Sequence, residues 1–315
     1  MPTLDLSVAP PPLRRAVARV AGPDAAAFLQ GTLTADVAGW DRARALPAAL
    51  LTRKGQLVAE VIVVPDPAGG DGIGLVVPAD VFDEVVSTLD RYLVMDDATV
   101  EPAPETRVWF AWEEPPGDAT ASHDGHGVIV PAVHPARGWL CVGPAAFVEA
   151  VTAGAPAGTA ESFEAHRVAC ERPGWGHELR PGRLPPELGY ADAVSYDKGC
   201  FLGQEPLARV HARGLVPRVM VRVNAAQAAD PLPVELASDD RPQAGRLTTL
   251  VPAGERFEGL ALVHRSVAVP GTALRVAGSG AVIEVCSGPI GDDPGASEAN
   301  KARMKAARAR LRTGK

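Results

Sequence analysis

The sequence predicts an α+β protein in which a mixed N-terminal body is followed by a small β-barrel. The chain has 315 residues, 46% of them hydrophobic, so it is long enough for more than one domain and can bury a sizeable core. Its 32 glycines and 30 prolines imply many turns and short elements. From residue 216 to about 290, short apolar runs are separated by Gly, Pro and Asp, as is typical of a barrel.

The first elements expected along the chain are a strand, a turn and a short helix. Residues 17–20 alternate like a half-buried strand. The Gly-Pro-Asp run at 22–24 predicts a turn, with Asp24 as the N-cap of the helix that follows. Residues 25–33 then predict that helix.

A β-hairpin is predicted next. Two strand-like runs at 46–51 and 57–64 flank a turn at 53–56 that contains Lys and Gly. Residues 73–77 predict another strand. Residues 79–92 carry apolar side chains at helical spacing, which predicts an amphipathic helix.

The centre of the chain alternates between helices and loops. Helices are expected over 145–153 and 163–170. The stretch 113–127 is rich in Gly, Pro, Asp and His and predicts a surface loop. Two histidines in this loop, His123 and His126, have no third ligand nearby, so we interpret them as solvated rather than metal-binding.

Charge and targeting signals limit the functions that the protein is expected to have. The net charge of −7 argues against a generic nucleic-acid-binding surface. Residues 298–315 hold seven Lys or Arg and one acid, so this tail suits contact with RNA or an acidic partner, although a solvated tail is the favoured interpretation. The chain shows no signal-peptide pattern and no apolar run of membrane-spanning length, which predicts a cytoplasmic protein without membrane contact.

The four cysteines argue against a disulfide framework and against a self-contained metal site. They are widely spaced and form no C-x-x-C pair, whereas a structural zinc or iron–sulfur site usually needs four clustered ligands. A cluster would have to be shared with a partner or held transiently. The cysteines are Cys141, Cys170, Cys200 and Cys286.

The most informative segment runs from Asp197 to Glu205 and places Cys200 among a lysine, two glycines and a Gln-Glu pair. The glycines suggest a tight turn or the close approach of a ligand. Lys198 has a charge that favours the thiolate, which is the reactive and metal-binding form of cysteine. The residues alone leave a second interpretation open, because an isolated free cysteine is commonly a small core hydrophobe.

The run from Lys198 to Glu205 resembles the K-G-C-[FY]-x-G-Q-E motif of the YgfZ-type folate-binding proteins. These proteins are relatives of the aminomethyltransferase of the glycine cleavage system. Four further stretches of the chain resemble the same family, and in the one at 167–178 Glu171 replaces the family's glycine. These further matches lie at residues 20–37, 167–178, 245–249 and 259–265.

The resemblance implies an aminomethyltransferase-like folate-binding body in a ring-like arrangement at residues 1–215, with a middle subdomain near 50–140. The β-barrel is then expected at 216–292 and a basic tail at 293–315. Members of this superfamily bind tetrahydrofolate in the central hole of the ring, which residues 163–209 are expected to line.

Site residues follow from the same resemblance. Cys200 and Lys198 are the expected catalytic pair. Glu178 and Glu187 are candidates to accept the paired N–H donors of a pterin, and each is alternatively a helix cap or a surface acid. Arg209 is expected either to pair with a folate carboxylate or to form a structural salt bridge. The full set expected to bind the cofactor is Glu178, Glu187, Gly199, Gly203, Gln204, Glu205 and Arg209.

The function implied is that of a monomeric, tetrahydrofolate-binding accessory protein that supports the assembly or repair of iron–sulfur proteins. Its expected partners are folate and iron–sulfur client or assembly proteins, and Cys200 is a candidate transient cluster ligand. True aminomethyltransferases carry an N-A-S-N-like segment that residues 75–83 lack, which argues against glycine cleavage. Two alternatives stay open: a folate-dependent one-carbon transferase or demethylase, and a non-catalytic protein-interaction module.

Overall fold

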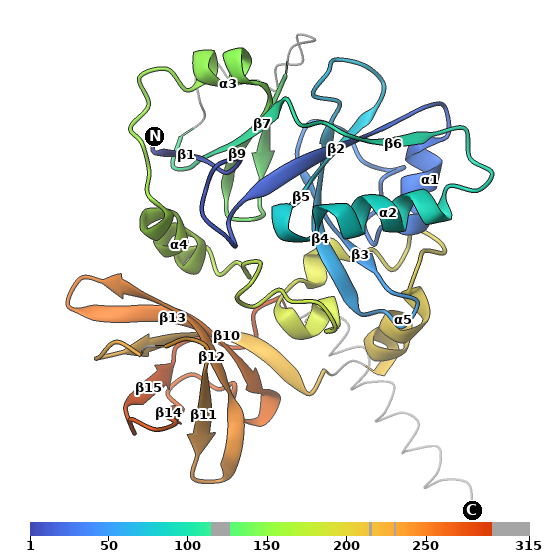
Figure 1. The fold of residues 1–315 in the computed structure, drawn as a ribbon. Coiled ribbons are helices and arrows are strands. Elements are labelled where there is room, and N and C mark those ends of the chain that lie inside the picture. Colours follow the sequence, from blue (N-terminus) through green and yellow to red (C-terminus); the bar gives the residue numbers. More distant parts are fainter. Residues whose placement is uncertain (115–126, 214–215, 230, 292–315) are drawn as a thin grey trace, which may run out of the picture.

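The computed structural model describes residues 1–114, 127–213, 216–229 and 231–291. Within these ranges the chain forms two facing antiparallel sheets with helices on their outer sides, a connecting segment, and a separate closed barrel (Figure 1). The prediction of an α+β body followed by a barrel is therefore confirmed. His123, His126 and the basic tail lie outside the described residues.

The first sheet has five antiparallel strands, and its second strand, β4, is buried along its whole length. Helix α1 (Ala25–Thr32) and helix α2 (Phe82–Tyr92) pack on one face through Phe28, Leu29, Val85 and Leu89. The predicted hairpin and helices are thus confirmed. In spatial order the strands are β3 (Leu46–Leu51), β4 (Leu57–Pro65), β5 (Ile73–Pro78), β2 (Arg15–Ala21) and β6 (Thr99–Pro102).

The predicted N-cap position of helix α1 is confirmed, but the side chain there does not cap the helix. Asp24 occupies the N-cap position, but its side chain makes no bond to the helix. Its Oδ2 instead accepts a hydrogen bond of 2.8 Å from the backbone N–H of Asp97, in the loop before β6. Asp24 therefore holds two loops together instead of capping the helix.

The second sheet has four antiparallel strands and packs face to face on the first. Ile62 and Val76 of the first sheet meet Phe110, Val130 and Leu140 of the second in a shared core. Its outer face is covered by helix α3 (Ala145–Val151). In spatial order the strands are β1 (Thr3–Asp5), β7 (Thr106–Ala111), β9 (Gly138–Pro144) and β8 (Val128–Ala132).

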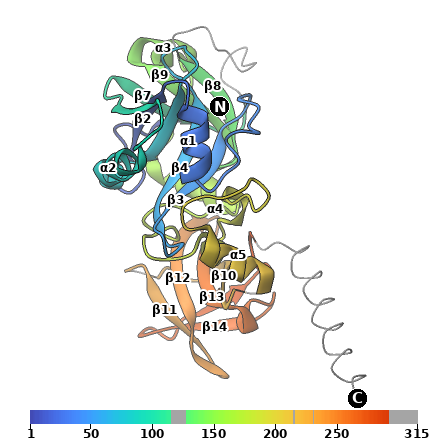
Figure 2. The same cartoon turned by 90° about the vertical axis from the view of Figure 1, so that its right-hand side faces the viewer.

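A connecting segment joins the body to the barrel. Helix α4 (Ala160–Ala169) begins with a capping box between Thr159 and Ser162. After it come two 3₁₀ turns, η2 (Pro185–Leu188) and η3 (Ala191–Ala193), and then helix α5 (Gln204–Arg213). Figure 2 shows α4 and α5 at the level where body and barrel meet. Trp175, Tyr190 and Leu207 anchor this segment in the core of the first sheet.

The barrel is closed by six antiparallel strands and has its own core, which includes Val221, Leu247 and Val263. It contacts the body through Val168 of α4 with Met220 and Leu260. In spatial order the strands are β10 (Arg218–Ala225), β13 (Arg256–His264), β12 (Arg241–Ala253), β11 (Val234–Ser238), β14 (Ala273–Val276) and β15 (Val282–Val285), with a 3₁₀ turn, η4 (Arg265–Val267), after β13.

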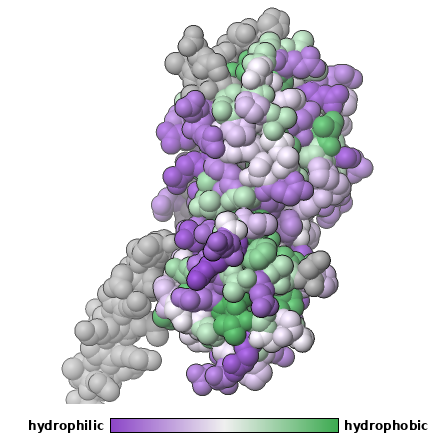
Figure 3. All heavy atoms as spheres, turned by 90° about the vertical axis from the view of Figure 1, so that its left-hand side faces the viewer, coloured by the Kyte–Doolittle hydropathy of each residue, from purple (hydrophilic) through white to green (hydrophobic). Residues whose placement is uncertain are grey.

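Among the helices that the structure describes, none is both long enough and apolar enough to cross a membrane. Figure 3 shows a face on which polar and apolar side chains are mixed, with the more apolar areas over the barrel.

Candidate functional site

Cys200 lies on an exposed loop just before α5. Gly199 beside it has a φ of +97°, a left-handed conformation that strongly favours glycine, and a Cβ added there would meet no atom within 4 Å. The thiol therefore stands at the molecular surface, and the alternative interpretation of a buried core cysteine was wrong for Cys200.

Lys198 anchors this loop to the segment that follows α1. Its Nζ donates hydrogen bonds to the carbonyl oxygens of Leu33, at 2.7 Å, and Ala35, at 2.5 Å. The Lys198 carbonyl in turn accepts a bond of 3.2 Å from Nε2 of Gln30. Burial lowers the pKa of Lys198 to about 8, against the opposing charge of Asp36. The contacts of this ammonium hold the Cys200 loop in place.

Gly203, three residues after Cys200, lets the loop pack directly on the β3–β4 hairpin. Gly203 has a φ of +76°, and a Cβ there would lie 2.4 Å from the carbonyl oxygen of Thr52. Opposite it, a Cβ on Gly55 would lie 3.1 Å from the Gly203 carbonyl oxygen. The two glycines thus permit backbone contact between the K-G-C loop and the hairpin turn, and at Gly203 this contact leaves no room for a Cβ.

The Gln-Glu pair opens helix α5. Glu205 and Arg209, one helical turn apart, form a salt bridge of 2.8 Å in which their side chains are 85% and 59% exposed. Of the two roles expected for Arg209, the structure shows this pairing. An exposed pair of this kind contributes only about 0.3–0.5 kcal/mol to stability.

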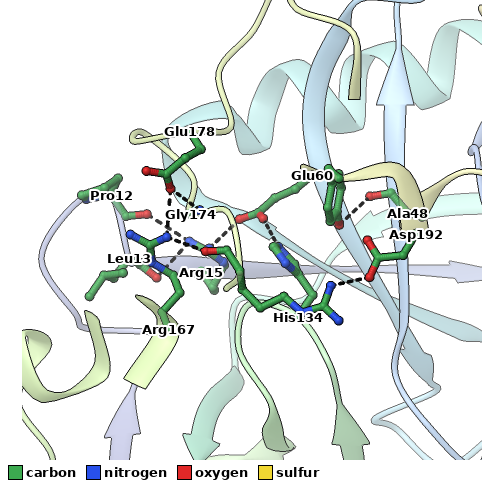
Figure 4. Close-up of polar contacts among 12 residues, drawn as sticks. Pro12, Leu13, Arg15, Ala48, Glu60, His134, Arg167, Gly174, Glu178 and Asp192 are labelled. Carbon is green, nitrogen blue, oxygen red and sulfur yellow. Dashed lines mark hydrogen bonds and ion pairs between the residues drawn. The ribbon is translucent and has the colours of Figure 1, made fainter. Parts of the chain in front are cut away.

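Glu178 is buried where the body meets the barrel, and Figure 4 shows its carboxylate hydrogen-bonded to Arg167. Its Oε2 accepts hydrogen bonds of 2.9 Å from Nη1 of Arg167 and 2.9 Å from the N–H of Gly174. Its Oε1 accepts from the hydroxyls of Thr248, at 2.5 Å, and Thr249, at 2.7 Å. Burial alone would raise the pKa of Glu178, but the charge of Arg167 and these donors outweigh it and lower that pKa. Glu178 therefore joins α4 and β12 as a carboxylate.

Arg167 is the fully buried centre of the same network. Its guanidinium also donates to the carboxylate of Glu164, at 2.5 and 3.0 Å, and to the Arg172 carbonyl oxygen at 2.6 Å. A Cβ on Gly174 would lie 2.7 Å from Cζ of Arg167, so the guanidinium packs directly against the backbone at this glycine. Sequence analysis assigned no role to Arg167, Thr248 or Thr249.

A cavity of about 610 Å³ lies beside this network, between the body and the barrel. Glu178 stands behind its wall, hydrogen-bonded to the lining residues Thr248 and Thr249. Glu187 lies elsewhere, in a smaller cavity of about 140 Å³. Polar groups of the 610 Å³ cavity come from Glu161, Glu164, His177, Arg180, Thr248 and Thr249.

The structure thus separates the predicted site residues into three places. Lys198, Gly199, Cys200, Gly203, Gln204 and Glu205 form one continuous surface segment with Arg209 on the helix that follows. Glu178 adjoins the larger cavity and Glu187 the smaller one. Within the described ranges, no three His, Cys, Asp or Glu side chains come together in a way that would hold a metal ion.

A second buried polar cluster, which sequence analysis missed, lies between the two sheets (Figure 4). Glu60 of β4 accepts a hydrogen bond of 2.5 Å from Nη2 of Arg15 and pairs through its other oxygen with Nε2 of His134. All three side chains are almost fully buried. The available signal was a single acid, Glu60, in the otherwise apolar strand β4.

Comparison with known proteins adds sequence relatives and a structural neighbour. No protein-family model matches the chain. The iron–sulfur cluster assembly factor IBA57 of Homo sapiens is 30% identical over 275 residues, which cover 79% of this chain and 75% of that protein. The tRNA-modifying protein YgfZ of Escherichia fergusonii is 25% identical over 225 residues, covering 65% and 68% of the two chains.

The aminomethyltransferase T of the glycine cleavage system from Bartonella henselae superposes with a TM-score of 0.75. The match covers 92% of this chain and 86% of that one at 15% sequence identity, so it shows the fold alone. The fold predicted from the K-G-C motif and its companion stretches is confirmed. By its identity and coverage against the human relative, and by this fold, the chain belongs to the IBA57/YgfZ family of proteins with an aminomethyltransferase-like fold.

Proposed function

We propose that this protein supports the assembly or repair of iron–sulfur proteins and that Cys200 is the thiol through which it acts. The observation that carries the proposal is an exposed cysteine on a loop anchored by Lys198 and packed on the β3–β4 turn. The name of the human relative supports the same activity. The cytoplasmic location and the monomeric state remain predictions.

An exposed thiol on an anchored loop suits transfer between proteins. Iron–sulfur clusters are usually held by several cysteine thiolates, and Cys200 supplies one. The other ligands would come from a partner docked on the surface around α5. In this proposal the cluster is cargo that Cys200 contacts transiently.

We further propose that tetrahydrofolate binds in the 610 Å³ cavity. Its size suits a small organic molecule, since ligand pockets measure roughly 300–1,000 Å³. Glu161 and Glu164 offer carboxylates to the N–H donors of a pterin, and Arg180 offers a guanidinium to a folate carboxylate. Glu178 does not line the cavity itself, but it accepts hydrogen bonds from the lining residues Thr248 and Thr249 and so fixes their hydroxyl groups.

Filling the cavity tests the folate proposal. Ala160, the first residue of α4, lines the cavity, and Ala160→Trp is expected to weaken tetrahydrofolate binding at least tenfold because the indole occupies the ligand's space. Anaerobic isothermal titration calorimetry measures this. The matched control is Ala145→Trp, at the first, exposed position of α3, which should bind like wild type. Absence of saturable binding by the wild-type protein would contradict the folate proposal and leave the role of Cys200 standing.

Loosening the loop tests the anchoring role of Lys198. Lys198→Met keeps the aliphatic stem but removes the donors to two carbonyls, so we expect a loss of about 1–3 kcal/mol in the free energy of unfolding. Hydrogen exchange near residues 198–203 should quicken as well. Lys54→Met, on the exposed hairpin turn, is the control. Equal stability of the two variants would show that the contacts of Lys198 do not fix the loop.

A further inference from the structure

A thiol–imidazole pair lines a second cavity, of about 600 Å³, on the body. Cys170 caps the C-terminal end of α4, and His166 lies one turn earlier on the same face of the helix. The cavity lies where the end of α4 meets the segment before β3 and the β8–β9 hairpin. It is separate from the Cys200 loop, which contacts the end of α1 and the β3–β4 turn.

The geometry determines where the imidazole hydrogen lies. Nε2 of His166 is 2.7 Å from the carbonyl oxygen of Arg137. A carbonyl oxygen can only accept, so Nε2 carries the hydrogen. The same nitrogen is 3.6 Å from Sγ of Cys170, so this N–H also faces the sulfur. The ring is held by stacking on Trp112 at 5.8 Å between centroids.

The surroundings favour a thiolate at Cys170. Burial by itself would raise the pKa of Cys170, but the hydrogen bond from His166, the backbone N–H of Arg137 and the charges of both residues outweigh it and lower that pKa. The bond to Cys170 likewise raises the pKa of His166, against the effect of burial. By contrast, burial raises the pKa of Cys141 to about 12 and also raises that of Cys286. The thiolate is the nucleophilic form of cysteine.

The rest of the cavity indicates the charge of a ligand. Arg44 and Arg137 line it together with Glu113, so two guanidinium groups stand against one carboxylate. The side chain of Arg44 is 70% exposed and only loosely paired with Asp41, at 3.6 Å, so it is accessible to an anion. Apolar walls come from Leu46, Pro47, Val133 and Trp139.

We propose that Cys170 is a thiol–disulfide exchange site whose cavity takes a low-molecular-weight disulfide carrying carboxylates. The Cys170 thiolate attacks one sulfur of the disulfide, and a new S–S bond forms as the original S–S bond breaks. Cys170 is oxidised to a mixed disulfide, and the departing sulfur leaves as a thiolate that takes a proton from water. His166 is the positioning residue, because its Nε2–H faces the attacking sulfur.

The test uses the Cys200→Ser/Cys286→Ser variant, which retains Cys141 and Cys170. With the dianionic disulfide 5,5′-dithiobis(2-nitrobenzoic acid), we expect one equivalent of released thiolate per folded chain in a fast phase, and mass spectrometry should place the adduct on Cys170. Adding Cys170→Ser should abolish the fast phase, since buried Cys141 reacts only after unfolding. Two results would overturn the proposal: a fast phase that persists after Cys170→Ser is added, or the absence of a fast phase in the Cys200→Ser/Cys286→Ser variant itself.

Two further variants test the pair and the charge preference. His166→Phe retains a ring against Trp112 but removes the N–H that faces the sulfur, so the thiolate fraction should fall and the reaction should slow several-fold. Relative to free N-acetylcysteine, Cys170 should prefer the anionic disulfide over cationic cystamine. Arg137→Gln, which keeps the backbone N–H, should reduce that preference several-fold. No preference in the starting variant, or an unchanged rate with His166→Phe at unchanged thermal stability, would contradict the assignment.

Discussion

Replacing Cys200 by alanine is expected to abolish support of iron–sulfur enzymes in cells while leaving the fold unchanged. The side chain is exposed, so its loss opens no core cavity and should change the free energy of unfolding by less than about 0.5 kcal/mol. The proposed function depends on this thiol as a cluster or partner contact. The measurement is the activity of [4Fe–4S] enzymes in cells whose own copy of the gene is deleted and replaced by the variant.

The matched control is Cys286→Ala, which removes a half-buried thiol at the end of the barrel strand β15. It should restore enzyme activity fully, because the pKa of Cys286 is raised and its Sγ donates to the carbonyl of Glu284. Full restoration by Cys200→Ala, with the protein present at normal abundance, would rule out the thiol as the acting group. Failure of both variants would point to a general requirement for intact cysteines instead.

Local sequence patterns were sufficient for most of the elements. The β3–β4 hairpin depends on two apolar runs around a short turn, and α2 depends on apolar spacing over a few turns, so neighbouring residues determine both. The short strands β8 and β9 were not predicted. Their apolar residues are buried against the first sheet and α3. These packing partners are distant in the sequence, so a pattern read over a few neighbouring residues does not reveal them.

The candidate site could be found in part. The K-G-C motif identified Cys200, but its exposure depends on Lys198 reaching Leu33 and Ala35, more than 160 residues earlier. Glu178 was singled out as a candidate pterin acceptor or else a helix cap or surface acid, whereas the structure buries it with hydroxyl partners about 70 residues further on, in the barrel. Pairings at such separations come from tertiary packing, of the connecting segment on the body in one case and of the barrel on the body in the other, which sequence spacing does not encode.

Replacing Glu178 by glutamine is expected to be the most destabilising single change at this junction, at about 3–5 kcal/mol. The substitution removes the charge that pairs with buried Arg167 and turns an amide toward donors that need an acceptor. Chemical denaturation measures the loss. The control is Glu164→Gln, which alters a second partner of the same guanidinium at the cavity wall, where the carboxylate is 14% exposed. Water can compensate there, so the cost should be smaller.

The pH dependence distinguishes a charge effect from a packing effect. Because the folded-state pKa of Glu178 lies below its ordinary value of 4.5, its stabilisation is fully present above that pH and is lost as the pH falls through the folded value. The gap in unfolding free energy between wild type and Glu178→Gln should therefore narrow in acid. A gap that stays constant as the pH falls would mean that the shape of the side chain, and not its charge, joins the body to the barrel.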